Sequence, residues 1–353
     1  MTTTDKFHLA FALNATGQIP DATAGAPATP DHWEAILRRI EGQADFVTLE
    51  DHFGEAADGF DAGLLANRLG PVVRGIGIIP GAVLNYNEPF HVSTTIATLD
   101  YVTEGRAGLL AQRLRPQEAA AVVSVVGRLN GFPEPVDPDL DEDARDAVEV
   151  IRRLWDSWED DAVIRDAASQ RFIDGSKLHY IDFKGKRFSV LGPSIVPRPP
   201  QGQPVVAVSA RDAADLAFAA ETADVVFLQP GDTPPGDFIA QAREAQARAA
   251  RSGPLRHFLD VAVSFDGDSG ARGAALGWSG AASDLVAQLT HWRAAGADGF
   301  RLIPRDLARD LAGLTEVVIP ALRDAGRIYE VRNGTLRQSL GLPAAVNRHI
   351  AAA

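Results

Sequence analysis

Residues 204–229 read PVVAVSARDAADLAFAAETADVVFLQ, and this stretch contains the structural unit on which the fold depends. Two short apolar runs, 205–209 and 225–229, flank a segment, 212–222, that has the composition and length of a helix. Strands that are buried on both faces are near-continuous apolar runs, and parallel strands need a crossover, usually a helix, between them. The stretch therefore predicts one strand–helix–strand unit of a parallel sheet.

The same alternation continues toward both ends of the chain. Strands are predicted at residues 7–13, 46–50, 75–79, 108–110, 205–209, 225–229, 259–265 and 300–303. Helices are predicted at residues 31–41, 60–69, 89–103, 141–158, 212–222, 237–250, 282–295 and 306–325. Eight alternations indicate the α/β class and a (β/α)8 TIM barrel that forms a single domain over residues 1–353. Because the fourth strand is short, a smaller doubly wound sheet is the alternative.

A long irregular stretch, roughly residues 111–203, separates the fourth and fifth predicted strands. It contains the predicted helix 141–158 and a predicted hairpin, 178–190, which a Pro-rich return follows. We interpret this stretch as an insertion in the barrel and not as a second domain. Binding residues of barrel proteins are commonly carried by loops, so substrate specificity is expected to depend on the insertion.

The composition favours a small molecule as the partner. The chain has 34 Lys and Arg residues against 47 Asp and Glu residues, and this net charge of −13 repels nucleic acid and anionic lipid. The absence of cysteine excludes disulfides, thiolate catalysis and Cys-ligated metals. Since the sequence shows neither a long apolar run nor a signal peptide, we expect a cytoplasmic protein without nucleic-acid or membrane partners.

Active sites of (β/α)8 barrels form at the carboxyl ends of the strands, so the polar residues at those ends are the first candidates. The densest group is Glu50-Asp51-His52, which could act as an acid/base pair or as part of a metal site. The alternative is a loop cluster in which Asp51 bonds to backbone. No second histidine lies nearby at ligand spacing, so no metal is expected. The other strand ends contribute Asn14, Pro80, Gly81, Ser209, Arg211, Asp212 and Arg305.

Longer motifs connect the whole chain to one known family. Residues 154–162 read LWDSWEDDA, residues 86–92 read YNEPFHV, and residues 334–337 read GTLR. With these motifs the sequence resembles the nitrilotriacetate and dibenzothiophene-sulfone monooxygenase branch of the bacterial-luciferase-like flavin oxidoreductases. The resemblance implies a barrel that takes reduced FMN from a separate flavin reductase. It also implies insertion of one oxygen atom of O2 into a small organic substrate, and a homodimer or tetramer.

The resemblance also suggests which residues contact the flavin, and several of them depart from the family pattern. Asp51 matches an aspartate that lies near the flavin ring in the family. Gly81 stands where the family has a threonine, and Arg113 lies in a stretch after the fourth strand that lacks the family's hydroxyl residues. The resemblance assigns no catalytic residue here. The set expected to bind the cofactor is Asp51, Gly81, Arg113, Ser209, Arg211 and Asp212.

The strongest departure lies after the fifth strand, where the family has a Gln-Ala-Gly-x-Ser loop that holds the FMN phosphate. Here Asp212 occupies the start of the helix, and as an N-cap it would bond to the N–H groups that a phosphate uses. Asp215 would add negative charge in the first turn. Either the loop is rebuilt around Arg211, or it binds no phosphate.

These observations leave hypotheses of two classes. The first is an enzyme, a divergent two-component monooxygenase that uses reduced FMN and oxygen, or a deazaflavin in place of FMN. The second is a flavin-free barrel that acts as a non-catalytic partner subunit or as a small-molecule binding protein.

Overall fold

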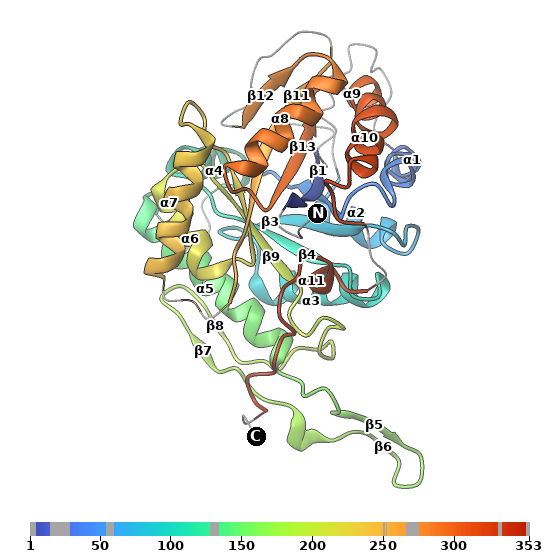
Figure 1. Cartoon of the computed structure of the whole chain (residues 1–353). Coiled ribbons are helices and arrows are strands. Elements are labelled where there is room, and N and C mark those ends of the chain that lie inside the picture. The colour runs from blue at the N-terminus through green and yellow to red at the C-terminus, as the bar shows by residue number, and fades with distance from the viewer. Residues whose placement is uncertain are drawn as a thin grey trace.

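The computed structural model describes residues 5–14, 29–53, 60–127, 134–249, 251, 253–265, 275–330 and 334–350, and of Asn14 the backbone alone. Within these residues, eight parallel strands close into a barrel in chain order, and the last strand pairs with the first (Figure 1). This confirms the predicted (β/α)8 barrel. The strands are β1 (His8–Asn14), β2 (Phe46–Glu50), β3 (Gly77–Val83), β4 (Gly108–Gln112), β9 (Val205–Ala210), β10 (Val225–Leu228), β11 (Arg256–Ser264) and β13 (Gly299–Pro304).

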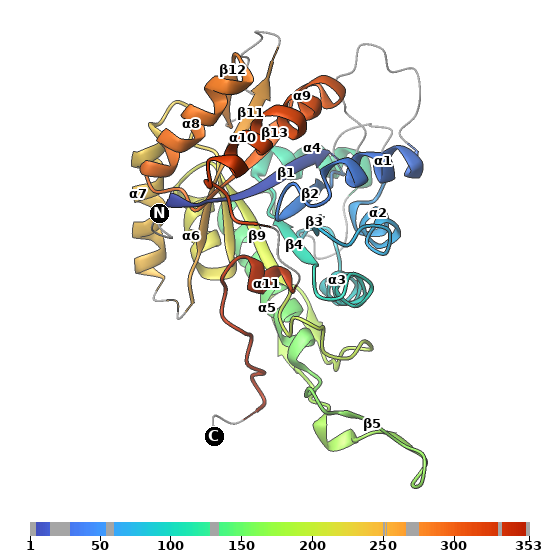
Figure 2. The ribbon, with the colours of Figure 1, turned by 45° about the vertical axis from the view of Figure 1, so that its right-hand side comes forward.

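Helices surround the barrel in both views (Figures 1 and 2). They are α1 (Pro30–Ile40), α2 (Ala62–Leu69), α3 (Pro89–Val102), α6 (Ala213–Thr222), α7 (Pro235–Arg248) and α8 (Ala282–Ala294). The last predicted helix, 306–325, is interrupted by a π-helical turn, so it forms α9 (Leu307–Gly313), η3 (Leu314–Val318) and α10 (Ile319–Asp324). A short strand, β12 (Leu276–Ser279), pairs with β11 outside the barrel. No helix among the described residues is both long enough and apolar enough to cross a membrane.

The excursion between β4 and β9 confirms the predicted insertion between the fourth and fifth barrel strands. The expected hairpin at 178–190 is present as β7 (Phe183–Lys184) and β8 (Ser189–Val190), although its strands are short. The predicted helix 141–158 begins earlier, as α5 (Asp137–Asp156). The sequence analysis missed α4 (Pro116–Val126) and a second hairpin, β5 (Val163–Asp166) with β6 (Arg171–Ile173), which projects away from the barrel (Figure 2).

The third barrel strand is longer than predicted, and this changes the position of Gly81. A proline usually ends a central strand, so the predicted strand stops at residue 79. In the structure β3 runs through Pro80 to Val83, and Gly81 pairs with Leu110 of β4. Gly81 is therefore an interior strand residue, and the expectation that it lies after the strand end is wrong.

The barrel interior is apolar toward the amino ends of the strands, and the C-terminal segment closes this end. Leu336 and Leu340, in and beside the short helix α11 (Leu336–Ser339), belong to the same buried cluster as Phe46 and Phe258 of the barrel strands. Leu336 also lies against Gly77, the first residue of β3. Buried Arg337 bonds to Asp224, which precedes β10, with Nη2 3.2 Å from Oδ1. The carboxyl ends of the strands form the other end of the barrel.

Candidate functional site

A cavity of about 320 Å³ lies at the carboxyl ends of the barrel strands. Its lining comes from the ends of β2, β3, β4, β9 and β10, and from α4 and α6. Four of the residues predicted to bind the cofactor, Asp51, Arg113, Ser209 and Arg211, line it together. Asp212 and Gly81 do not belong to the lining. The position of the cavity agrees with the general rule that barrel sites form at this end.

The walls of the cavity combine apolar and polar side chains in similar number. Leu110 and Val208 belong to its strand walls, and Ala121 and Val122 of α4 line it from the insertion. Among the described residues of the insertion, those that line the cavity fall between residues 111 and 122. The rest of the insertion ends at the opposite side, where the Arg198 carbonyl accepts a hydrogen bond from the Tyr101 hydroxyl near the end of α3. Within the described residues, the expectation that the insertion determines specificity therefore concerns its first part, and it stays a prediction.

The Gln112 side chain holds the backbone of Asp51 in place at the cavity. The Gln112 side chain accepts a hydrogen bond from the Asp51 N–H through Oε1 and donates one to the Asp51 carbonyl through Nε2, each at 3.0 Å. Gly81 leaves room for this amide, because a Cβ at residue 81 would lie 2.0 Å from Gln112 Oε1. Gly81 thus acts on the site indirectly, through the position of Asp51.

The Asp51 carboxyl group has an unusual affinity for protons. Burial raises its pKa to about 6, and the negative charge of Asp61 adds to the shift. The hydrogen bond that its Oδ1 accepts from the His52 N–H, at 2.9 Å, opposes the shift. Asp51 can therefore exchange a proton near neutral pH, which is the property of an acid/base group. The alternative of a backbone-bonded loop aspartate also fits part of the geometry.

A polar layer lies beneath the cavity in the centre of the barrel. Arg301 of β13 is fully buried and forms a two-point ion pair with Asp260 of β11. Its Nη1 lies 3.5 Å from Glu50 Oε1, and its Nη2 donates to Ser209 Oγ at 3.4 Å. Since Glu50 and Ser209 both line the cavity, this ion pair fixes two residues of its floor. The sequence analysis missed it, although the signal was present as single charged residues within two apolar strands.

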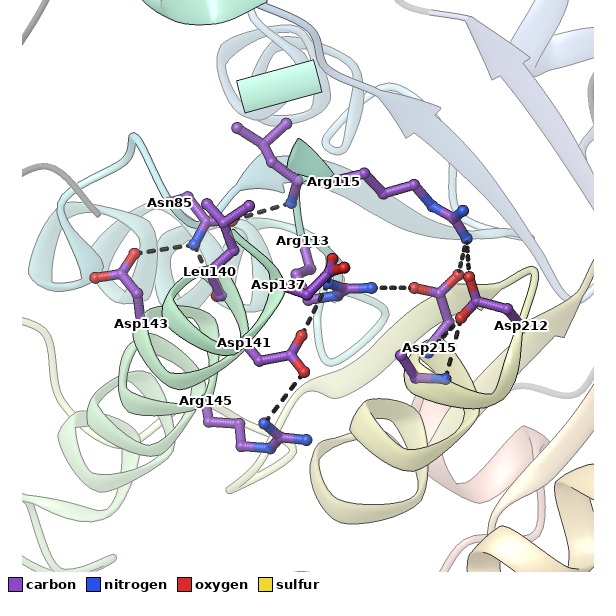
Figure 3. A network of polar contacts seen from close by, with 12 residues as sticks. Asn85, Arg113, Arg115, Asp137, Leu140, Asp141, Asp143, Arg145, Asp212 and Asp215 are labelled. Atoms are coloured by element: carbon purple, nitrogen blue, oxygen red, sulfur yellow. Dashed lines mark hydrogen bonds and ion pairs between the residues drawn. The ribbon is translucent and has the colours of Figure 1, made fainter. Parts of the chain in front are cut away.

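An arginine–carboxylate network borders the cavity on the α6 side (Figure 3). Arg113 Nη2 lies 2.5 Å from Asp215 Oδ1, and Arg115 Nη2 lies 2.6 Å from Asp215 Oδ2. Arg115 also pairs with Asp212 at 2.9 Å. The predicted N-cap role of Asp212 is confirmed, because its Oδ1 accepts from the N–H groups of Ala214 and Asp215, both at 3.0 Å. Asp215 is not the uncompensated charge that we expected.

The same network ties the insertion to the barrel. Arg113 Nη1 lies 2.8 Å from Asp141 Oδ1 of α5, so one guanidinium links α5 with α6 (Figure 3). Asn85 completes the junction: its side chain donates to Leu140 O and Asp143 Oδ2, and accepts from the Leu114 N–H, each at 3.0 Å. The sequence analysis did not single out Arg115 or Asn85, because their partners are distant along the chain.

Arg305 and Asn14 are the remaining predicted residues at strand ends. The Arg305 N–H donates to Val263 O at 3.0 Å and to Asp310 Oδ2 at 3.1 Å. The side chain of Asn14 lies outside the described residues. Within the described part of the chain, no group of three or more His, Cys, Asp or Glu side chains is placed to hold a metal ion.

The sequence model of the family described as luciferase-like monooxygenase matches residues 10–309 of this chain. The chain belongs to the luciferase-like monooxygenase family. N-acetyl-S-(2-succino)cysteine monooxygenase of Bacillus subtilis is 32% identical over 60% of this chain and 49% of its own length. Nitrilotriacetate monooxygenase component A of Aminobacter aminovorans is 35% identical over 52% of this chain and 40% of its own length. The chain thus spans about half the length of these relatives or less.

A further relative and a solved structure agree with this membership. Dibenzothiophene-sulfone monooxygenase of Rhodococcus erythropolis is 31% identical over 66% of this chain and 54% of its own length. Among solved structures, long-chain alkane monooxygenase superposes with a TM-score of 0.81, at 20% identity, and covers 97% of this chain and 96% of that chain. At this level of identity, the likeness of the structures shows the luciferase-like fold alone.

The family resemblance implies FMN, whose phosphate would have to bind at the start of α6 in this luciferase-like barrel. The N–H groups at the start of α6 are already bonded to Asp212. In the network around Asp215, three arginines, Arg113, Arg115 and Arg211, meet five carboxylates, Glu118, Asp137, Asp141, Asp212 and Asp215. An added phosphate would meet a net negative charge, and the helix N–H groups and the guanidinium Nη groups that it would need are already bonded to carboxylates, so the residues at this end of the cavity do not fit it.

Proposed function

We propose that this chain is a divergent flavin-dependent monooxygenase that acts on a small organic substrate in the cavity at the carboxyl ends of the barrel strands. The observation that carries the proposal is the position of Asp51, a carboxyl group with a pKa of about 6, at the wall of that cavity. Family membership supplies the reaction class. As in the family resemblance, the flavin would arrive reduced from a separate flavin reductase.

The residues of the chain suit three parts of such a reaction. The apolar part of the wall, which includes Leu110, Val122 and Val208, can pack against the apolar part of a bound molecule, and the polar part can orient it. Asp51 holds or releases a proton near neutral pH at its second carboxylate oxygen, Oδ2, for which no hydrogen bond is present among the described residues, while Oδ1 accepts from the His52 N–H. The Gln112 amide keeps the Asp51 backbone in place. FMN remains the flavin expected from family membership, but the residues at the start of α6 do not form a binding site for its phosphate.

The alternative function is a flavin-free barrel that acts as a partner subunit or as a binding protein. The observation that favours it is the same arginine–carboxylate network, because it closes the place where a phosphate would bind. A deazaflavin is the third possibility, and two deazaflavin-dependent enzymes, a secondary alcohol dehydrogenase and a tetrahydromethanopterin reductase, share the fold at TM-scores of 0.65 and 0.64. That likeness concerns the fold alone.

The absorption spectrum of the purified protein separates these functions. Titration with FMN, riboflavin and a deazaflavin, each oxidised and then chemically reduced, should perturb the flavin bands and give saturable binding of one of them if the chain is an enzyme of the proposed kind. The reduced complex should then react with oxygen at a rate that differs from that of free flavin. If none of the three binds at concentrations up to about a millimolar, the flavin-free alternative takes its place.

We also propose that the chain self-associates, as a homodimer or tetramer. Large apolar side chains are exposed on the insertion after α5 and on the C-terminal segment, which contact each other through hydrogen bonds from the Asn347 side chain to the carbonyls of Asp156 and Trp158. Burial of such side chains between copies is favourable. The exposed side chains are Phe172, Tyr180, Leu191, Ile195 and Val346.

A cytoplasmic location stays a prediction.

A further inference from the structure

We propose that the Asp215 carboxylate is an internal substitute for the anionic group of a ligand, so that the cavity selects molecules that lack a phosphate at the α6 end. Asp215 thereby becomes a specificity-determining residue. The inference rests on the cavity being the ligand site, as in the proposed function, but it does not require that the ligand is a flavin.

The surroundings of Asp215 are those of a bound anion. Its Oδ1 is 2.5 Å from Arg113 Nη2, and its Oδ2 is 2.6 Å from Arg115 Nη2 and 2.9 Å from the Arg211 backbone N. These donors come from the segment that follows β4 and from the β9–α6 loop, so they converge from two places on the barrel. Two guanidinium groups and a backbone N–H are the typical donors to a phosphate or carboxylate. Here the protein supplies the anion itself.

Each of the two arginines keeps one N–H donor that no acceptor among the described residues uses. The Arg113 side chain is only 4% exposed and lines the cavity, yet its Nε has no hydrogen-bond acceptor among the described residues. The Nε of Arg115 is also buried without an acceptor in the described part of the chain. A carboxylate offers two oxygens, whereas a terminal phosphate offers three. Although Arg113 also pairs with Asp141 and Arg115 also pairs with Asp212, the two unused Nε donors leave capacity for an anion with more oxygens than the Asp215 carboxylate.

The consequence for ligands follows from the charges. A phosphate entering the α6 end would have to displace Asp215 from both arginines, and it would also approach the Asp212 carboxylate. Displaced carboxylates in a partly buried site repel the phosphate strongly. The cavity of the natural chain should therefore bind uncharged ligands, or the dephosphorylated form of a ligand, at least as well as the phosphorylated form.

The decisive comparison uses two substitutions at the same position. Asp215→Ala removes the carboxylate and leaves space between the arginines, whereas Asp215→Asn removes the charge but fills the space. Inorganic phosphate should bind Asp215→Ala and raise its midpoint of thermal unfolding in a saturable way, relative to sodium chloride of the same ionic strength. It should do so neither for Asp215→Asn nor for the natural chain. Equal responses of the two variants would overturn the inference.

Loss of Asp215 leaves two arginines partly unpaired, so Asp215→Ala is expected to be less stable. If this variant is unfolded in buffer, refolding in phosphate but not in chloride supports the inference, and failure to refold in either overturns it. Asp224→Ala is the matched control, because Asp224 is also buried between two arginines, Arg152 and Arg337, but does not line the cavity. Rescue of this control by phosphate to the same degree would show a general effect of anions on arginines and would overturn the inference.

A second measurement connects the inference to the proposed function while keeping the two separable. If the chain binds flavins, Asp215→Ala should improve the affinity for FMN relative to riboflavin by about tenfold to a hundredfold, the range expected for new charged hydrogen bonds. A chain that binds riboflavin but shows no phosphate effect in either variant retains the proposed function and contradicts the inference. A phosphate effect without any flavin binding retains the inference and contradicts the proposed function.

Discussion

Arg301 and Asp260 form a two-point ion pair in the centre of the barrel, with Nε 2.8 Å from Oδ1 and Nη2 2.5 Å from Oδ2, and neither side chain is exposed. The Arg301 guanidinium also lies over the Phe227 ring, 3.9 Å from its centroid. Its remaining donors reach Thr48 and Ser209. Because Ser209 and Glu50 line the cavity, this ion pair affects both the stability of the barrel and the shape of the cavity.

Breaking this pair on one side should be strongly destabilising. Asp260→Ala leaves a buried guanidinium without its carboxylate, and we expect a loss of about 3–5 kcal/mol in the free energy of unfolding, measured with urea. Glu244→Ala is the control, since the Glu244–Arg248 pair on α7 is exposed and should contribute less than about 1 kcal/mol. A loss at Asp260 no larger than that at Glu244 would contradict this account of the barrel centre.

Asp51 should make the folded protein less stable as the pH rises. Its pKa in the folded state is about 6, above the ordinary value of 3.8, so the folded chain holds this proton more tightly than the unfolded chain. Stability from the protonated form is present below pH 4 and is lost as the pH rises to about 6. We therefore expect Asp51→Asn to be more stable than the natural chain above pH 6 and equally stable near pH 4.

The opposite pH dependence is expected at Asp161, an exposed carboxylate on the insertion. The hydrogen bond from Lys177 lowers its pKa, so Asp161→Asn should lower stability slightly at neutral pH, and this difference should disappear as the pH falls through the lowered pKa of the folded state. Urea unfolding at several pH values measures the stability of both variants, Asp51→Asn and Asp161→Asn.

If Asp51→Asn and the natural chain unfold with the same pH dependence between pH 4 and 7, the raised pKa of Asp51 is wrong.

Gly81 should be required mainly because of the Gln112 side chain, since the other close neighbour of a Cβ at this position, the Asp51 backbone nitrogen, would lie at 3.0 Å. Gly81→Ala places a methyl group 2.0 Å from Gln112 Oε1, and the resulting displacement should cost about 1–3 kcal/mol of stability. The double substitution Gly81→Ala, Gln112→Ala removes the obstacle. It should cost less than the sum of the two single changes, a coupling that a double-mutant cycle measures. Additive losses would mean that the two residues do not interact.

Self-association should depend on the exposed apolar residues of the insertion. Ile195 is 72% exposed, and Ile195→Asp should shift the mass from light scattering toward the 37.6 kDa of one chain. Val317→Asp, at a half-exposed position on η3, is the control and should leave the mass unchanged. A natural chain that is already monomeric at micromolar concentration would remove the basis of this prediction.

The fold could be predicted from the sequence because its signals are local. The barrel strands are apolar runs, and Asp212 is an N-cap that bonds to the next residues in the chain. The site could be predicted only in part. In the sequence Asp215 looks like a free charge, because its partners, Arg113 and Arg115, lie about one hundred residues earlier. The Arg301–Asp260 pair is hidden for the same reason, since only barrel closure brings β13 beside β11.

The packing of α11 against the base of the barrel has a consequence for how the protein is made. Asp224 precedes β10, yet one of its two arginine partners, Arg337, is translated more than one hundred residues later. Until then the nascent barrel exposes the apolar side chains that Leu336 and Leu340 will cover, and Asp224 has Arg152 alone. We therefore expect the barrel to reach its final stability only when the segment after residue 334 is in place.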